Sequence, residues 1–98
     1  MAFGEVQCGV WPVPPTRTPA PVTADGAAPI LVVGTTDDPA TPYQWAQALA
    51  KELSSGRLLT WHGEGHTAYG RGSGCVDDAV DGYLLDGVLP GEGATCER

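Results

Sequence analysis

The sequence has few basic residues and no long apolar run, and each absence excludes a class of function. Lysine and arginine together number five against twelve acidic residues, which gives a net charge of −7. This balance argues against nucleic acid or an anionic membrane surface as a partner. The longest apolar runs extend over only a few residues, which is too short to cross a bilayer. We therefore expect neither a nucleic-acid nor a membrane partner.

Recognisable targeting and cofactor motifs are also missing. The start of the chain, M-A-F-G-E-V-Q-C, has neither the basic region nor the apolar region of a signal peptide. No phosphate-binding loop, dinucleotide fingerprint or nucleic-acid-binding module occurs in the sequence. We expect no signal peptide in this chain and no cofactor.

The distribution of proline divides the chain into two parts. Six of the nine prolines lie in residues 1–29. Proline fixes φ and removes a backbone donor, so this stretch cannot form a central strand or helix. We predict a Pro-rich irregular connection over 1–29 and one ordered unit over 30–96, since 98 residues allow at most one domain.

Residues 30–89 alternate between strand and helix patterns. The β-branched run from Ile30 to Val33 predicts a strand that is buried on both faces. The T-x-x-Q sequence at Thr41 predicts a capping box for a helix that runs to about Ser54, with Gly56 ending it in the left-handed conformation. A second strand is predicted over 57–61. Apolar spacing at positions 76, 79, 80, 83 and 84 predicts a last helix that ends at Asp86-Gly87.

The predicted fold class is therefore α/β, a β-α-β-α unit with two parallel, adjacent strands. Three or more strands are usually needed for a stable sheet, and parallel strands are normally covered by helices on both faces. We therefore expect this unit to leave one strand edge and one sheet face for structure outside the chain.

Two residues capable of acid–base chemistry follow the two strands. Asp38 precedes Pro39, which keeps it extended and outside the next helix. His66 lies in the glycine-flanked sequence G-E-G-H-T. Ligand sites of α/β sheets lie beyond the carboxyl ends of the strands. An acid followed by a histidine matches the second and third members of a Ser-Asp-His triad in α/β-hydrolase chain order. Taken alone, each is better explained as an ordinary turn or loop residue.

A nucleophile to accompany this pair is missing, because no G-x-S-x-G sequence occurs. Ser54 and Ser55 fall at a helix end, and Ser73 is placed to cap the last helix. The sequence His62-x-Glu-x-His66 suggests a metal site, but it lacks the helical spacing of the zinc motif and contains two glycines. We expect no metal there.

Three cysteines occur, at positions 8, 75 and 96. A Cys75–Cys96 bridge would hold the Gly/Pro-rich tail to the start of the last helix, and the alternative is a pair of reduced, buried thiols. With an odd count, Cys8 either pairs outside this chain or is free.

The combination of motifs resembles one family. V-V-G-T-T-D-D-P-A-T-P, the G-E-G-H-T-A-Y-G loop and C-V-D-D-A-V-D-G-Y-L-L-D-G-V-L-P, followed by a terminal cysteine, are similar to the C-terminal TAP-like domain of secreted actinobacterial α/β-hydrolases. These are serine peptidases of the tripeptidyl aminopeptidase type. The resemblance covers about Ala28 to Cys96. It implies that Asp38 is the triad acid, with Asp37 in place of the usual glycine, that His66 is the triad histidine, and that Cys75 and Cys96 form a disulfide.

Two interpretations follow from the resemblance and the missing serine. In the first, the chain is the C-terminal part of a secreted or cell-envelope serine peptidase. Its partners are then an N-terminal hydrolase portion and a peptide or small ester or amide substrate. In the second, it is a non-catalytic truncated remnant that only binds or has a structural role.

Overall fold

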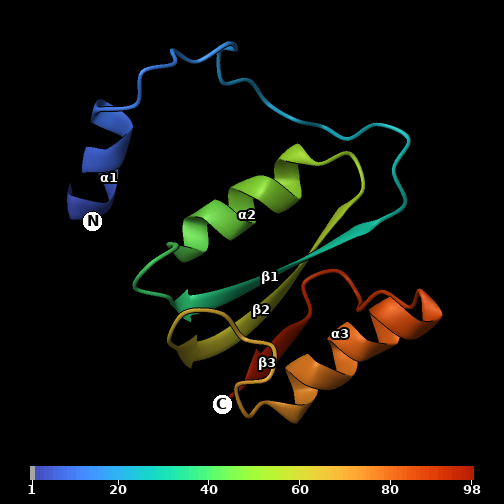
Figure 1. Cartoon of the computed structure of the whole chain (residues 1–98). Coiled ribbons are helices and arrows are strands. Elements are labelled where there is room, and N and C mark those ends of the chain that lie inside the picture. The colour runs from blue at the N-terminus through green and yellow to red at the C-terminus, as the bar shows by residue number, and fades with distance from the viewer. Residues whose placement is uncertain (1) are drawn as a thin grey trace.

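The computed structural model describes residues 2–98, with side chains described from Val6 onward. Its elements in chain order are α1 (Ala2–Gly9), β1 (Ile30–Asp37), α2 (Tyr43–Glu52), β2 (Gly56–Glu64), α3 (Gly74–Asp86) and β3 (Thr95–Glu97). The three strands form one parallel sheet in the order β1-β2-β3, and Figure 1 shows the sheet between α2 and α3. The predicted α/β class and the parallel pairing of the first two strands are confirmed.

Alternation along β2 places the two helices on opposite faces of the sheet. Thr60 points toward α2, where its hydroxyl lies 2.6 Å from the Tyr43 hydroxyl. Leu59 and Trp61 point the other way, into the cluster that contains the fully buried Val76 of α3. The expectation that one face of the sheet would be bare is therefore wrong, because each face carries one helix.

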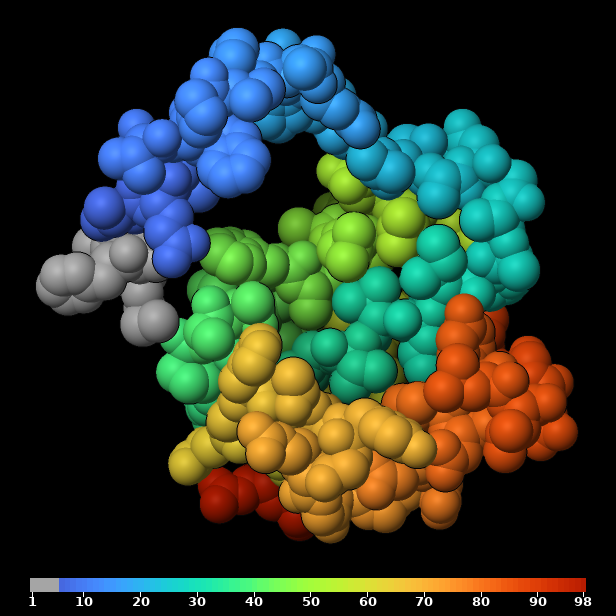
Figure 2. All heavy atoms as spheres, in the orientation of Figure 1, coloured from blue at the N-terminus to red at the C-terminus, as the bar shows by residue number. Residues whose placement is uncertain are grey.

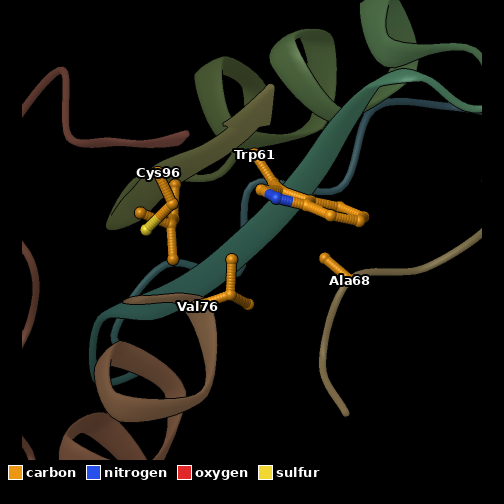
Figure 3. Close-up of a cluster of buried hydrophobic side chains, with 5 residues drawn as sticks. Trp61, Ala68, Val76 and Cys96 are labelled. Atoms are coloured by element: carbon orange, nitrogen blue, oxygen red, sulfur yellow. The ribbon is translucent and has the colours of Figure 1, made fainter. Parts of the chain in front are cut away.

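The apolar core lies between the strands and the start of α3. Leu59, Trp61, Ala68, Val76 and Cys96 are buried there. Figure 3 shows Trp61, Ala68, Val76 and Cys96 gathered around one region, with Val76 at the start of α3. A disulfide joins Cys75 of α3 to Cys96 of β3 and Cys8 is free and exposed, so the expected bridge is present.

Helix α3 begins and ends as the sequence predicts, but its buried face is narrower. The Ser73 hydroxyl accepts a hydrogen bond from the Val76 N–H, and Gly87 closes the helix in the left-handed conformation. Leu84, placed on the buried face by its spacing, is 68% exposed. The predicted apolar stripe therefore packs only through its first turns.

Helix α2 differs from the prediction at both ends. Thr41 makes no cap, because the helix begins at Tyr43 after Pro42 and has no side-chain cap. Gly56 is not left-handed but is the first residue of β2. A Cβ at Gly56 would lie 2.3 Å from the Ala50 carbonyl oxygen, so close approach to α2 is what requires glycine here.

The N-terminal segment contains an element that the sequence analysis missed. Helix α1 occupies Ala2–Gly9, ahead of the first proline, within the segment predicted to be irregular. The following stretch forms an arm that arches over α2 in the space-filling view (Figure 2). The arm joins the body near β1, where the Ser54 N–H donates to the Thr23 carbonyl at 2.8 Å.

The sheet has a third strand and one irregularity near the strand ends. β3 was not predicted because it is only three residues long and follows Gly91-Glu92-Gly93. The register between β1 and β2 shifts after Thr35, so that Asp37 faces Glu64. At this bulge the Thr36 hydroxyl accepts from the Gly63 N–H and donates to the Gly63 carbonyl, which satisfies groups that the ladder leaves unpaired.

Candidate functional site

The carboxylate of Asp38 is held by the turn that joins β1 to α2. Its Oδ1 accepts hydrogen bonds from the Ala40 and Thr41 N–H groups, both at 2.9 Å. Its Oδ2 accepts from the Thr41 hydroxyl at 2.9 Å. Because Asp38 precedes Pro39, its backbone is biased away from the helical conformation. Its side chain instead accepts hydrogen bonds from the backbone of the turn.

The same contacts set the charge state of Asp38. The Thr41 backbone N–H, foremost, together with the Ala40 N–H, the His66 ring and the Thr41 hydroxyl, holds the pKa of Asp38 well below its ordinary value, although partial burial works in the opposite direction. Donors that point at a carboxylate favour its ionised form. Asp38 is therefore a fixed anion at neutral pH.

His66 faces this carboxylate from the loop after β2. Its Nδ1 lies 3.0 Å from Oδ2 and 3.2 Å from Oδ1 of Asp38. The Asp38 side chain is 7% exposed, whereas the imidazole is 50% exposed. A carboxylate beside Nδ1 favours a proton on that nitrogen, so in the neutral ring Nε2 carries the lone pair. The predicted approach of Asp38 to one nitrogen of His66 is present.

Asp37 and His62, the neighbours of the pair in sequence, do not join it. Asp37 is the exposed last residue of β1, and its backbone carbonyl accepts from the Gly65 N–H at 3.2 Å. His62 is exposed on β2, with its Nε2 4.0 Å from Glu97 Oε1. Residues 2–98 contain no cluster of three or more His, Cys, Asp or Glu side chains arranged to hold a metal ion.

Thr41 is a site residue that the sequence analysis assigned to a different role. Its hydroxyl donates to Asp38 and lies 3.3 Å from Nδ1 of His66, so it touches both members of the pair. A signal for the turn was available in the sequence, because an aspartate side chain often accepts hydrogen bonds from the backbone N–H groups that follow it. The T-x-x-Q capping pattern competed with that signal.

An open groove of about 440 Å³ begins at the pair. One side is the edge of β1 and the other is α2, with the loop at 66–69 closing one end; the apolar lining residues include Val32, Trp45, Ala46 and Leu49. Trp45 is 62% exposed, and within residues 2–98 no strand pairs with this edge of β1. The predicted open strand edge is confirmed, and it lies beside the pair.

Comparison with known proteins identifies the family that the chain matches. The family described as TAP-like protein matches residues 1–96. The chain is 48% identical over 89 residues to the serine protease Hip1 of Mycobacterium tuberculosis, and 49% identical over 89 residues to carboxylesterase B of the same species. It is 37% identical over 97 residues to the tripeptidyl aminopeptidase of Streptomyces lividans.

These alignments cover most of the chain but little of each relative. They include 91% of the chain for the two mycobacterial proteins and 97% for the Streptomyces protein. The chain spans about a sixth of the length of these relatives, 17% for the mycobacterial pair and 18% for the peptidase.

Proposed function

The chain belongs to the TAP-like family of α/β-hydrolases, and we propose that it supplies the acid and the base of a Ser-Asp-His triad whose serine lies outside these 98 residues. The observation that carries the proposal is the contact between Asp38 and Nδ1 of His66 beyond the ends of two parallel strands. Hydrolysis by a serine nucleophile needs this arrangement. The aspartate must hold the histidine ring in the tautomer whose Nε2 is free to accept the proton of the serine hydroxyl.

The proposed chemistry assigns one task to each side chain. His66 Nε2 takes the proton from the serine hydroxyl as its oxygen bonds to the substrate carbonyl carbon. The same nitrogen then returns that proton to the leaving amine or alcohol as the scissile bond breaks, and water repeats the sequence to release the acid. Asp38 stays ionised, keeps Nδ1 protonated and stabilises the imidazolium formed in both steps.

The proposed substrate is a peptide with a free amino terminus, or a small ester or amide. Relatives described as a serine protease, a carboxylesterase and a tripeptidyl aminopeptidase support hydrolysis of an acyl group bound to nitrogen or oxygen. Release of short peptides from the amino terminus is the specific activity we propose.

The proposed partner is the serine-bearing hydrolase portion, seated along the groove. A strand added beside β1 would pair its open edge, and apolar side chains would cover Trp45 and Leu49, both exposed here. Burying such surface is favourable by about 25 cal/mol per Å². The small share of each relative that the chain spans supports a partner of this kind.

The proposed location is an oxidising compartment, outside the cytoplasm or in the cell envelope. The Cys75–Cys96 disulfide supports it, because such bonds persist where thiols are not kept reduced. No helix in residues 2–98 is long and apolar enough to cross a membrane.

Labelling with a fluorophosphonate, which reacts with activated serines, tests the function. We expect the product of the complete reading frame to be labelled and the 98-residue chain alone to remain unlabelled. His66→Ala in the complete product should abolish labelling. A complete product that contains a G-x-S-x-G serine and is not labelled would support the non-catalytic remnant instead.

A further inference from the structure

The position of His66 depends on the backbone of its loop, since half of its ring surface is in contact with solvent. The next residue, Thr67, has φ of 71°. A β-branched residue adopts this left-handed conformation only where its surroundings hold it. The contacts of the loop between residues 66 and 72 therefore decide whether His66 faces Asp38.

Two side chains of α3 hold this loop. Asp77 Oδ1 accepts a hydrogen bond from the Gly70 N–H at 2.8 Å, and Asp81 Oδ1 accepts one from the Tyr69 hydroxyl at 2.7 Å. Residues four apart lie on the same face of a helix, so both carboxylates face the loop. The bond to Asp81 also raises the pKa of Tyr69, which keeps the phenol protonated as the donor.

The loop in turn holds the backbone of His66. The guanidinium of Arg71, the residue after Gly70, donates to the His66 carbonyl at 3.0 Å. Gly70 has φ of 74°, in the left-handed region that favours glycine. A charged acceptor makes the Asp77 contact stronger than one between neutral groups.

The start of α3 is itself well fixed. Val76, directly before Asp77, has no exposed surface, and Cys75 is bonded to β3. The Ser73 side chain accepts the Val76 N–H and the Ser73 carbonyl accepts the Asp77 N–H. Asp77 therefore projects from a rigid helix start onto a strained loop.

We propose that Asp77 is a positioning residue, which holds the loop through Gly70 so that His66 keeps Nδ1 on Asp38. The predicted effect of Asp77 on turnover rests on the proposed function, whereas its predicted effect on the order of the loop does not. Asp77 touches no reacting atom, and its role is to reduce the number of loop conformations in which Nε2 is misplaced.

The first experiment measures loop order in the 98-residue chain by amide hydrogen exchange and by the NMR signal of the His66 Nδ1–H. Asp77→Ala should speed exchange of the Gly70 amide by about tenfold or more and broaden or remove the ring signal. Asp78→Ala is the matched control, because it removes the same charge from the same helix turn, where Asp78 is exposed. Equal effects of the two variants, or an unchanged Gly70 amide, would overturn the proposal.

The second experiment measures kcat and KM in the complete, serine-bearing protein. Asp77→Ala should lower kcat by about 10- to 100-fold with KM little changed, since displacing a reacting group by about 1 Å has this effect. Asp77→Asn keeps an oxygen acceptor for Gly70 and should restore most of kcat. Asp78→Ala should match the wild type.

One further variant and two outcomes separate the proposed triad from the proposed positioning role of Asp77. If Asp77→Ala does not fold, Tyr69→Phe removes only the hydroxyl bonded to Asp81 and should give a smaller change of the same sign. A wild type without turnover, with loop exchange as predicted, contradicts the triad and leaves the positioning role standing. An active wild type in which Asp77→Ala and Asp78→Ala have equal kcat contradicts the positioning role alone.

Discussion

Nδ1 of His66 lies 3.0 Å from Oδ2 of Asp38, although the carboxylate is nearly enclosed and the imidazole is half exposed. The difference in exposure follows from where each residue is placed. Asp38 is enclosed by the turn that it caps, whereas His66 reaches it from a loop of the neighbouring strand. The Asp38 carboxylate is thus held in a fixed position, and half of the His66 side-chain surface stays accessible to solvent.

The pH dependence of stability should reveal the fixed anion. The pKa of Asp38 is lowered in the folded chain, so its contribution to stability is fully present above its unfolded pKa of about 3.9 and is lost as pH falls toward the lower folded value. Urea unfolding of the wild type and of Asp38→Asn should therefore differ most above about pH 5 and converge in more acidic solution. A difference that is constant with pH would contradict this.

Thr41 should tune the acid through its hydroxyl. Thr41→Val removes that donor, so the pKa of Asp38 should rise, while the two backbone N–H groups keep it below its ordinary value. Carbon NMR of the Asp38 carboxyl during acid titration measures the change. Thr41→Ser keeps the hydroxyl and should titrate like the wild type. Identical titration of Thr41→Val would show that the hydroxyl bond does not act on Asp38.

The disulfide should account for a sizeable part of the stability. Replacing Cys75 and Cys96 together by serine should lower the free energy of unfolding by about 2–4 kcal/mol, because the bond restricts the unfolded chain. Cys8→Ser serves as control, since Cys8 is exposed and free, and should change little. Peptide mapping without reduction should find Cys8 alkylated, and linkage of Cys8 to either other cysteine would refute the pairing.

Two glycines should respond to alanine in opposite ways. A Cβ at Gly63 would lie 2.6 Å from the Trp61 ring, so Gly63→Ala should destabilise the chain by about 1–3 kcal/mol.

Gly82 lies inside α3 with no atom within 4 Å of an added Cβ, so Gly82→Ala should stabilise the chain by up to about 1 kcal/mol. Thermal unfolding of both variants measures these changes. An unchanged or stabilised Gly63→Ala would contradict the close contact with Trp61, and a destabilised Gly82→Ala would contradict the open space around Gly82.

Local sequence rules predicted the parts of the fold that depend on local chemistry. The serine cap at Ser73 and the glycine at position 87 act where the sequence predicts them. The β-branched run at Ile30 forms the predicted strand, but residues 30–33 are only half-buried and not buried on both faces as predicted, because the outer edge of β1 is open. Asp38 was chosen over Asp37 because of Pro39, and the structure places Asp38 against His66.

The errors came where tertiary contacts override local preference. The sequence pattern predicts Thr41 as a helix cap. In the structure, however, the Thr41 hydroxyl donates to the charged carboxylate of Asp38 in the turn. The strand β3 forms because it pairs with β2. A pairing between segments distant in the sequence cannot be predicted from the three residues of β3 alone. The exposure of Leu84 likewise depends on what packs against α3, which the apolar spacing of the helix does not indicate.

The central claim is that Asp38 and His66 act together on a serine, and the most direct measurement is kcat for an aminopeptidyl amide in the complete protein. His66→Ala should abolish turnover, and Asp38→Asn should lower kcat by about 10⁴, as expected when a triad loses control of its histidine tautomer. His62→Ala and Asp37→Asn, the neighbours that lie outside the pair, should retain most of the wild-type kcat. Turnover that survives His66→Ala, or that Asp37→Asn lowers more than Asp38→Asn, would contradict the assignment.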